Sequence, residues 1–191
     1  KEKITIPSTC TRIGMYAISC CKNLKEINVL SNITTIPQGF AYLNPALEKV
    51  TLPSTILTLD KQAFAICEVL TTIDLPYKLE TIGEECFMNC YSLDSIVLPP
   101  TLKHIGKSAF MNCKSMKKIY SQAHTPPTCE DAVVFVGVEQ DTPVYIPVGT
   151  MDSYQNTQGW KYFTNFIETE NFPNAVIDVV NDPTTVNSRA Y

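Results

Sequence analysis

The stretch "LPPTLKHIGKSAFMNC", residues 98–113, follows "LPYKLETIGEECFMNC", residues 75–90, at an offset of 23 residues. The two share Leu, Pro, Leu, Ile, Gly, Phe, Met, Asn and Cys at matching places. The same offset of 23 recurs along the chain and relates one apolar slot in six places, which are Ile4, Ile27, Val50, Ile73, Ile96 and Ile119. Internal repeats of this kind decide an architecture before any local structure is assigned.

Each repeat reads as one coil of chain that begins with a short strand. In the coil that starts at Ile73, a second apolar residue follows at Leu75, with polar residues between and before them. This alternation is typical of a strand that buries one face. Pro76 has no amide hydrogen to donate and ends the pairing, and a glycine-marked turn follows at Gly83.

A single coil cannot fold alone, because ordering its backbone costs more free energy than burying its few apolar side chains returns. Stacked coils cover each other's apolar layers and pair their strands. The sequence therefore predicts an α/β solenoid of stacked coils with one continuous parallel sheet of short strands. The strands are expected around Ile4, Ile27, Val50, Ile73, Ile96, Ile119 and Val144.

The repeat spacing divides the chain into three parts. Residues 1–118 hold five 23-residue coils, residues 119–168 hold irregular last coils and a C-terminal cap, and residues 169–191 form a tail or linker toward a C-terminal module that is missing from the sequence. Thr150 is expected to cap a short helix, and the aromatic Trp160 is expected to cover the last apolar layer. The second coil departs from the pattern at Pro37 and Phe40, so it should be locally distorted.

Eight cysteines would normally suggest a disulfide framework. Four of them instead share one slot, seventeen residues into each coil, which Asn44 fills in the second coil; they are Cys21, Cys67, Cys90 and Cys113. A column of small buried thiols explains this placement best, with disulfides and metal binding as the alternatives. The repeat does not explain Cys20 and Cys129.

The recurring phrase "IG..AF..C..L..I.LP" resembles the BspA-like, or Treponema-type, leucine-rich repeat from residue 4 to about residue 167. The resemblance implies a bacterial cell-surface or secreted protein, outer membrane-associated, that acts in adhesion and host-protein binding. The segment after Val144 resembles the "P.G....Y....GW..F..I.E" ending common after such repeats. "AVIDVVND", residues 175–182, resembles a stretch that precedes sorting modules in secreted Bacteroidetes proteins.

Several other functions find little support. The net charge is −4 without a run of Lys or Arg, which disfavours nucleic acid. The longest apolar run, "AVVFVGV", is too short to insert into a membrane. The opening "KEKITIP" has neither a start Met nor an apolar signal region, so the natural protein is expected to begin earlier.

The chemistry of an enzyme is not apparent either. A nucleophile pair of Cys129 and His124 has no supporting motif, and neither has His104. Glu84 and Glu85 occupy turn slots typical of a solvated edge. No cofactor or metal is expected.

The outward side of the predicted sheet remains as the candidate site. It is expected to bind a protein ligand, since solenoid sheets form extended binding surfaces; Tyr120 is its best single anchor. The alternatives are a passive spacer presenting another domain, whose alternating charges neutralise each other, then an enzyme or a glycan-binding module. The candidate residues are Lys25, Glu26, Asn28, Glu48, Lys49, Thr51, Thr71, Thr72, Asp74, Asp94, Ser95, Lys117, Lys118 and Tyr120.

Overall fold

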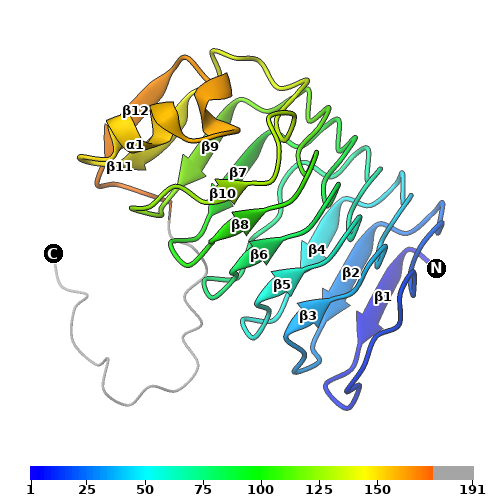
Figure 1. The fold of residues 1–191 in the computed structure, drawn as a ribbon. Coiled ribbons are helices and arrows are strands. Elements are labelled where there is room, and N and C mark those ends of the chain that lie inside the picture. Colours follow the sequence, from blue (N-terminus) through cyan, green and yellow to red (C-terminus); the bar gives the residue numbers. More distant parts are fainter. Residues whose placement is uncertain (174–191) are drawn as a thin grey trace, which may run out of the picture.

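The computed structural model describes residues 1–173 and shows a solenoid whose coils stack along one axis, with a cap at the C-terminal end (Figure 1). One wall carries β1 (Lys3–Ile6), β2 (Glu26–Val29) and β4 (Lys49–Thr51), followed by β7 (Ser95–Leu98), β9 (Lys118–Ser121), β11 (Val144–Pro147) and β12 (Phe166–Thr169). The opposite wall carries β3 (Thr35–Ile36), β5 (Thr58–Leu59), β6 (Thr81–Ile82), β8 (His104–Ile105) and β10 (Thr128–Cys129).

The strands pair in parallel at the repeat distance, as predicted. Ile27 lies opposite Val50, and Ile96 lies opposite Ile119. The apolar residues of these strands point inward and are almost fully buried. Within residues 1–173, helix is limited to α1 (Met151–Asn156) and a 3-10 turn at Trp160–Tyr162, so this part of the chain is a β-solenoid in which the expected α component is minor.

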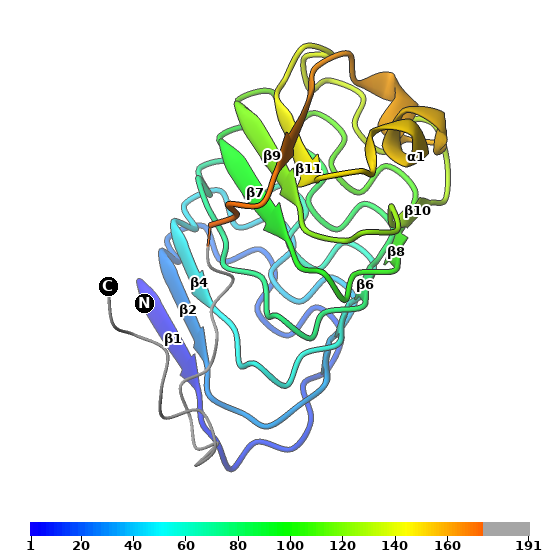
Figure 2. The ribbon, with the colours of Figure 1, turned by 90° about the vertical axis from the view of Figure 1, so that its left-hand side faces the viewer.

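The prediction of one continuous sheet is wrong. The strands of the first wall form two sheets, of order β1-β2-β4 and β12-β11-β9-β7. The segment around Ile73, between them, is not a strand, although its spacing to Val50 and Ile96 is regular. Asp74 stands in this segment where β4 has Thr51 and β7 has Val97, and Asp is depleted from strands. Figure 2 shows the two rows of strands, with this segment between β4 and β7.

The coils on either side of this break remain joined elsewhere. Thr58 and Leu59 of β5 pair with Thr81 and Ile82 of β6 on the opposite wall. Along the turn wall, the Phe64 N–H donates to the Cys86 carbonyl at 2.9 Å. Backbone hydrogen bonds therefore join the coils without interruption on the opposite wall and on the turn wall, and they are interrupted only on the first wall.

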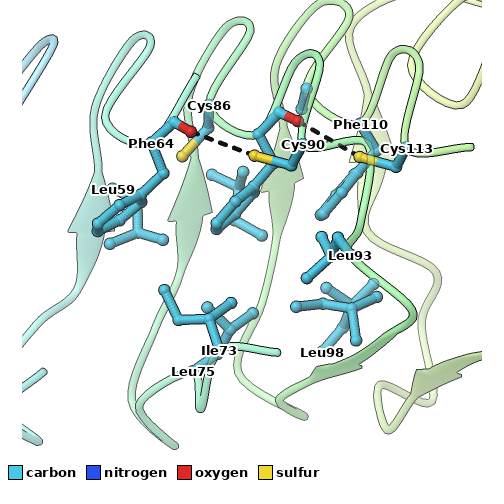
Figure 3. Packing of buried hydrophobic residues seen from close by; sticks show 14 of the residues in the cluster. Leu59, Phe64, Ile73, Leu75, Cys86, Cys90, Leu93, Leu98, Phe110 and Cys113 are labelled. Atoms are coloured by element: carbon cyan, nitrogen blue, oxygen red, sulfur yellow. Dashed lines mark hydrogen bonds between the residues drawn. The ribbon is translucent and has the colours of Figure 1, made fainter. Parts of the chain in front are cut away.

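The core is a set of stacked columns (Figure 3). Phe64, Phe87, Phe110 and Phe135 stack with ring centroids 5.4–5.6 Å apart. Phe40 meets Phe64 edge-on, at 6.1 Å and 83°. At this side chain the second coil departs from the stacked arrangement of the later coils, while its strands keep the 23-residue pairing; its expected local distortion otherwise stays a prediction.

The predicted cysteine column is buried at Cys67, Cys90 and Cys113. Each of these thiols is free and donates to the carbonyl 26 residues before it, as Cys90 does to Phe64 at 3.2 Å. Asn44 makes the same link through its side chain, donating to the Ile18 carbonyl at 2.8 Å. Burial raises the pKa of the Cys90 thiol to about 12 and raises the pKa values of Cys67 and Cys113 as well.

Two positions in each complete turn take left-handed backbone conformations that the sequence did not reveal. The second of them holds Cys20, whose φ is 58°, and also Ile66, Asn89 and Asn112 at 60–62°. Asparagine tolerates this conformation, and Asn112 donates to the Asn89 side chain at 2.8 Å. Ile66 is β-branched and is strained there.

The C-terminal cap closes the last layer with aromatic side chains. Trp160 is fully buried, donates through Nε1 to the Pro127 carbonyl at 2.9 Å and packs on Phe135. Thr150 occupies the predicted N-cap position, but its side chain does not cap the helix. Its hydroxyl donates to the Pro147 carbonyl instead of accepting from a helix N–H group. Instead, the Glu168 carboxylate accepts from the Gly149 and Met151 N–H groups at 2.8 and 3.1 Å.

The division of the chain at residues 118 and 168 stays a prediction. β12 continues regular structure through Thr169. The "AVIDVVND" stretch lies outside the described residues. Within residues 1–173, no helix has the length and apolar character needed to cross a bilayer.

Gly106, at a coil turn, offers a test of how closely neighbouring coils approach each other. A Cβ on Gly106 would lie 2.4 Å from the backbone nitrogen of Glu84, whereas a Cβ on Gly14 would meet nothing within 4 Å. Gly106→Ala should therefore lower the free energy of unfolding by about 1–3 kcal/mol, and Gly14→Ala should leave it nearly unchanged. Urea denaturation of both variants checks this, and equal effects would contradict the close approach of the coils.

The buried thiols should be inert in the native protein, because the thiolate is the reactive form. We expect iodoacetamide at pH 8 to modify exposed Cys20, and to modify Cys67, Cys90 and Cys113 only after denaturation. Mass spectrometry of the native and denatured protein identifies the modified residues. Rapid native labelling of Cys90 would refute the buried column.

Trp160→Ala should cost about 3–5 kcal/mol of stability, because it removes the largest side chain that covers the last coil. Tyr77→Ala is the matched control, since the Tyr77 side chain is exposed. Thermal unfolding followed by circular dichroism compares the two variants. Unchanged melting of the Trp160 variant would show that this residue does not stabilise the cap.

Candidate protein-binding face

The first three coils present the predicted charged columns, and part of their charge is paired within the sheet. Lys3 contacts Glu26 at 3.0 Å, and Lys25 contacts Glu2 at 3.4 Å. Lys49 lies beside Glu26 in the strand register. Glu48 and Lys49, both exposed, form no ion pair with any residue from 1 to 173.

A cleft opens where the sheet is broken. One side is β4, and the other is the segment around Thr72 and Asp74. The cleft has a volume of about 510 Å³. It is lined by Glu48, Lys49, Val50, Thr51, Leu52, Ser54, Thr72, Ile73, Asp74 and Pro76.

The floor of this cleft is apolar and its rim is polar. Val50 and Ile73 are each 6% exposed, whereas Ile27 and Ile96, in the same slot of paired coils, are 0% and 1% exposed. Leu52 is half-buried, although Leu75 and Leu98 are buried. The missing strand pairing thus uncovers a small part of the core on the predicted binding face.

The C-terminal part of the face carries an apolar row that sequence reasoning recognised only in part. Tyr120 pairs in register with Val97 and Tyr145, and Tyr145 pairs with Ile167. The rings of Tyr120 and Tyr145 stack, with centroids 4.6 Å apart and planes at 17°. These four residues are called the Tyr120 patch below; their side chains are half-buried or exposed.

Tyr120 is therefore not the only aromatic side chain on this face, because Tyr145 stacks on it from the next strand. Tyr145 directly follows Val144, which had been identified as a strand slot, and this position was the signal that could have revealed it. Lys118 places its ammonium 6.0 Å from the centre of the Tyr120 ring, and Lys117 is exposed beside it. The patch thus combines apolar area with positive charge.

Of the remaining predicted residues, Asn28 lies on β2 and the others lie between the charged columns and the Tyr120 patch. Thr71 and Thr72 are exposed, and Asp94 and Ser95 are half-buried. The Ser95 hydroxyl donates to the Asp94 carboxylate at 2.9 Å. Asn28 is half-buried, and its Oδ1 accepts no hydrogen bond from the described residues.

The groups considered for catalysis are arranged differently from an active site. Burial raises the pKa of Cys129 to about 12, the opposite of an activated thiol. His104 Nδ1 lies 3.2 Å from the Thr128 hydroxyl on the other wall. Glu84 pairs with Lys61 at 2.9 Å, and this hydrogen bond raises the pKa of Lys61. In the part of the chain that the structure describes, no three His, Cys, Asp or Glu side chains gather as metal ligands would.

Solved structures share this fold. A leucine-rich repeat protein from T. pallidum aligns with a TM-score of 0.61 and 22% identity, over 76% of this chain and 72% of that one. A leucine-rich repeat protein from Bacteroides ovatus aligns with a TM-score of 0.56 and 17% identity, over 91% of this chain and 55% of that one. No curated protein matches the sequence.

The sequence also matches a family model. Six copies of the "BspA type Leucine rich repeat region" match residues 1–123, well over half of the chain. Leucine-rich repeats commonly bind proteins, and their solenoids are typically non-catalytic scaffolds. The chain belongs to the BspA-type leucine-rich repeat family.

Proposed function

We propose that this chain is a non-enzymatic protein-binding module of a cell-surface or secreted, outer membrane-associated protein, and that it acts in adhesion. The observation that carries the proposal is the Tyr120 patch on the sheet face. Tyrosine is one of the residues that dominate binding energy in protein interfaces. Membership of the BspA-type family supports the location and the adhesive role.

The face suits a protein better than a small molecule. The Tyr120 patch crosses four neighbouring strands, β7, β9, β11 and β12, which at about 4.8 Å per strand step span roughly 14 Å. Charged side chains continue the face on β1, β2 and β4. An apolar centre with a polar surround is the usual anatomy of a protein interface.

A passive spacer is the second candidate, and the paired charges of the first coils favour it. Lys3–Glu26 and Lys25–Glu2 neutralise each other across β1 and β2, which leaves less charge available to a ligand there. This observation applies to the N-terminal coils and not to the Tyr120 patch. The two candidates therefore differ in whether substitutions in the patch change binding.

The test is binding of the chain to a panel of immobilised host extracellular-matrix and cell-surface proteins, measured by surface plasmon resonance. For a partner found in this way, Tyr120→Ala combined with Lys118→Glu should weaken binding by about 1–2 kcal/mol or more, because it removes the aromatic anchor and reverses its charge. Tyr77→Ala with Lys61→Glu is the matched control on other surfaces. Circular dichroism should show both variants folded.

Two results would contradict the proposal. One is full binding by the Tyr120 and Lys118 variant together with lost binding by the control, which would move the site off the sheet face. The other is a panel without a single partner, which would favour the spacer.

A further inference from the structure

β12 is the last strand of its sheet, and one of its two edges has no partner among residues 1–173 (Figure 2). On the paired edge, the Val144 N–H donates to the Asn165 carbonyl at 2.9 Å, and Val144 lies in register with Phe166. Successive residues of a parallel strand turn their backbone groups to opposite sides. Asn165 and Ile167 therefore face β11, whereas Phe166 and Glu168 turn their N–H and C=O groups to the free edge.

The chain that follows β12 leaves this edge open. The Gln122 side-chain amide donates to the Pro173 carbonyl at 3.2 Å. Because Gln122 directly follows β9, the chain after β12 turns back past β11 toward β9, away from the free edge. The backbone groups of Phe166 and Glu168 consequently form no backbone hydrogen bond with a described residue on that side.

The side chains of β12 do not protect the edge in the usual way. Proteins commonly place Lys or Pro on an exposed edge strand to prevent pairing with another chain. β12 contains neither, and the carboxylate of its one charged residue, Glu168, is engaged by the Gly149 and Met151 N–H groups. β1, the strand at the other end of this wall, carries Lys3 and is therefore the less suitable edge.

The free backbone groups are arranged symmetrically about Ile167. A two-fold axis at this residue places Phe166 opposite Glu168 of a second copy, in an antiparallel arrangement. Opposed residues of this kind exchange two hydrogen bonds, and the symmetry makes two such pairs. Ile167 then lies opposite Ile167 of the second copy in the closer, non-hydrogen-bonded type of pair, with Cα atoms about 4.5 Å apart.

The outward side chains suit this register. Ile167 is 36% exposed and would bury apolar surface against its counterpart. Thr169 would lie opposite Asn165 of the second copy, so no like charges oppose each other across the axis. Cross-strand contacts between apolar side chains stabilise antiparallel pairing, and like charges directly opposite each other destabilise it.

We propose that the free edge of β12 pairs with the β12 edge of a second copy of this chain, antiparallel and with the two-fold axis at Ile167. The proposal needs no ligand and goes beyond the proposed binding function. It joins the two C-terminal sheets, so that the Tyr120 patch of one copy continues into that of the other. Four-residue strands bury little area, so the association should be weak and concentration-dependent.

Sedimentation equilibrium of the full chain, at concentrations up to about 1 mM, measures the association. All samples carry Cys20→Ser, because the exposed Cys20 thiol could otherwise join two copies. The average mass should rise with concentration toward twice that of one chain. Ile167→Lys should weaken association about ten-fold or more, because it places two ammonium groups opposite each other. Thr5→Lys on β1 adds the same charge and is the matched control.

Cross-linking tests the position of the axis. In the Cys20→Ser chain, Ile167→Cys should form a disulfide-linked dimer on mild oxidation, because the expected Cα separation lies within the range of disulfides. Val97→Cys places a thiol on the same face of the sheet but on β7, at the far end of the strand order from β12. This control should stay monomeric unless the copies associate face to face.

Hydrogen exchange of the ¹⁵N-labelled chain tests the backbone pairing. The amides of Phe166 and Glu168 should exchange more slowly as the concentration rises. The Ile167 amide is the internal control, because it already faces β11 and its exchange should change little.

The proposal is overturned by a constant mass at all concentrations, or by equal cross-linking of the Ile167→Cys and Val97→Cys chains. Association that Thr5→Lys weakens and Ile167→Lys does not would move the contact to β1 and also overturn it. Protection of the Phe166 and Glu168 amides in dilute solution would show that this chain itself covers the edge.

The outcome is separate from that of the proposed binding function. Tyr120→Ala with Lys118→Glu changes β9, two strands away from β12, and should leave self-association unchanged. Loss of partner binding in that variant and loss of association in the Ile167→Lys chain are therefore independent results.

Discussion

The structure depends on one constraint: a coil cannot bury its own apolar layer and must be covered by the coils on both sides. This constraint requires equal spacing of corresponding residues, and each side chain therefore meets its counterpart 23 residues away, as Ile27 meets Val50. The phenylalanine stack and the thiol column both follow from this repetition. The cap follows from it as well, since the last coil has no successor and needs Trp160 to cover it.

The break in the sheet shows how much interruption this constraint tolerates. Coils on either side of Asp74 keep their separation through the opposite wall and through the Phe64 and Phe87 contact at 5.6 Å. Pairing on the first wall can therefore be lost without loss of the core. A solenoid can place irregular, ligand-accessible backbone in the middle of a sheet because two other sides maintain the stack.

The period, the parallel pairing and the buried cysteine slot could be predicted because they depend only on apolar spacing. Other features depend on three-dimensional contacts that spacing does not encode. Asp74 occupies a regular slot and still interrupts pairing, and Glu168 reaches a helix start far from it in sequence. The stacking of Tyr145 on Tyr120 required the register across a coil of 25 residues. The proposed site combines both kinds of feature, which is why its residues were identified from the sequence but its cleft was not.

The open junction beside β4 also affects how the protein unfolds. In a linear array, stability is a sum of repeat terms and nearest-neighbour terms, and the weakest neighbour term sets where the array divides. That term is reduced around the fourth coil, because its strand-wall backbone ladder is missing toward both the third and the fifth coil, while the opposite wall stays paired. The N-terminal three coils and the capped C-terminal part should consequently behave as two cooperative units.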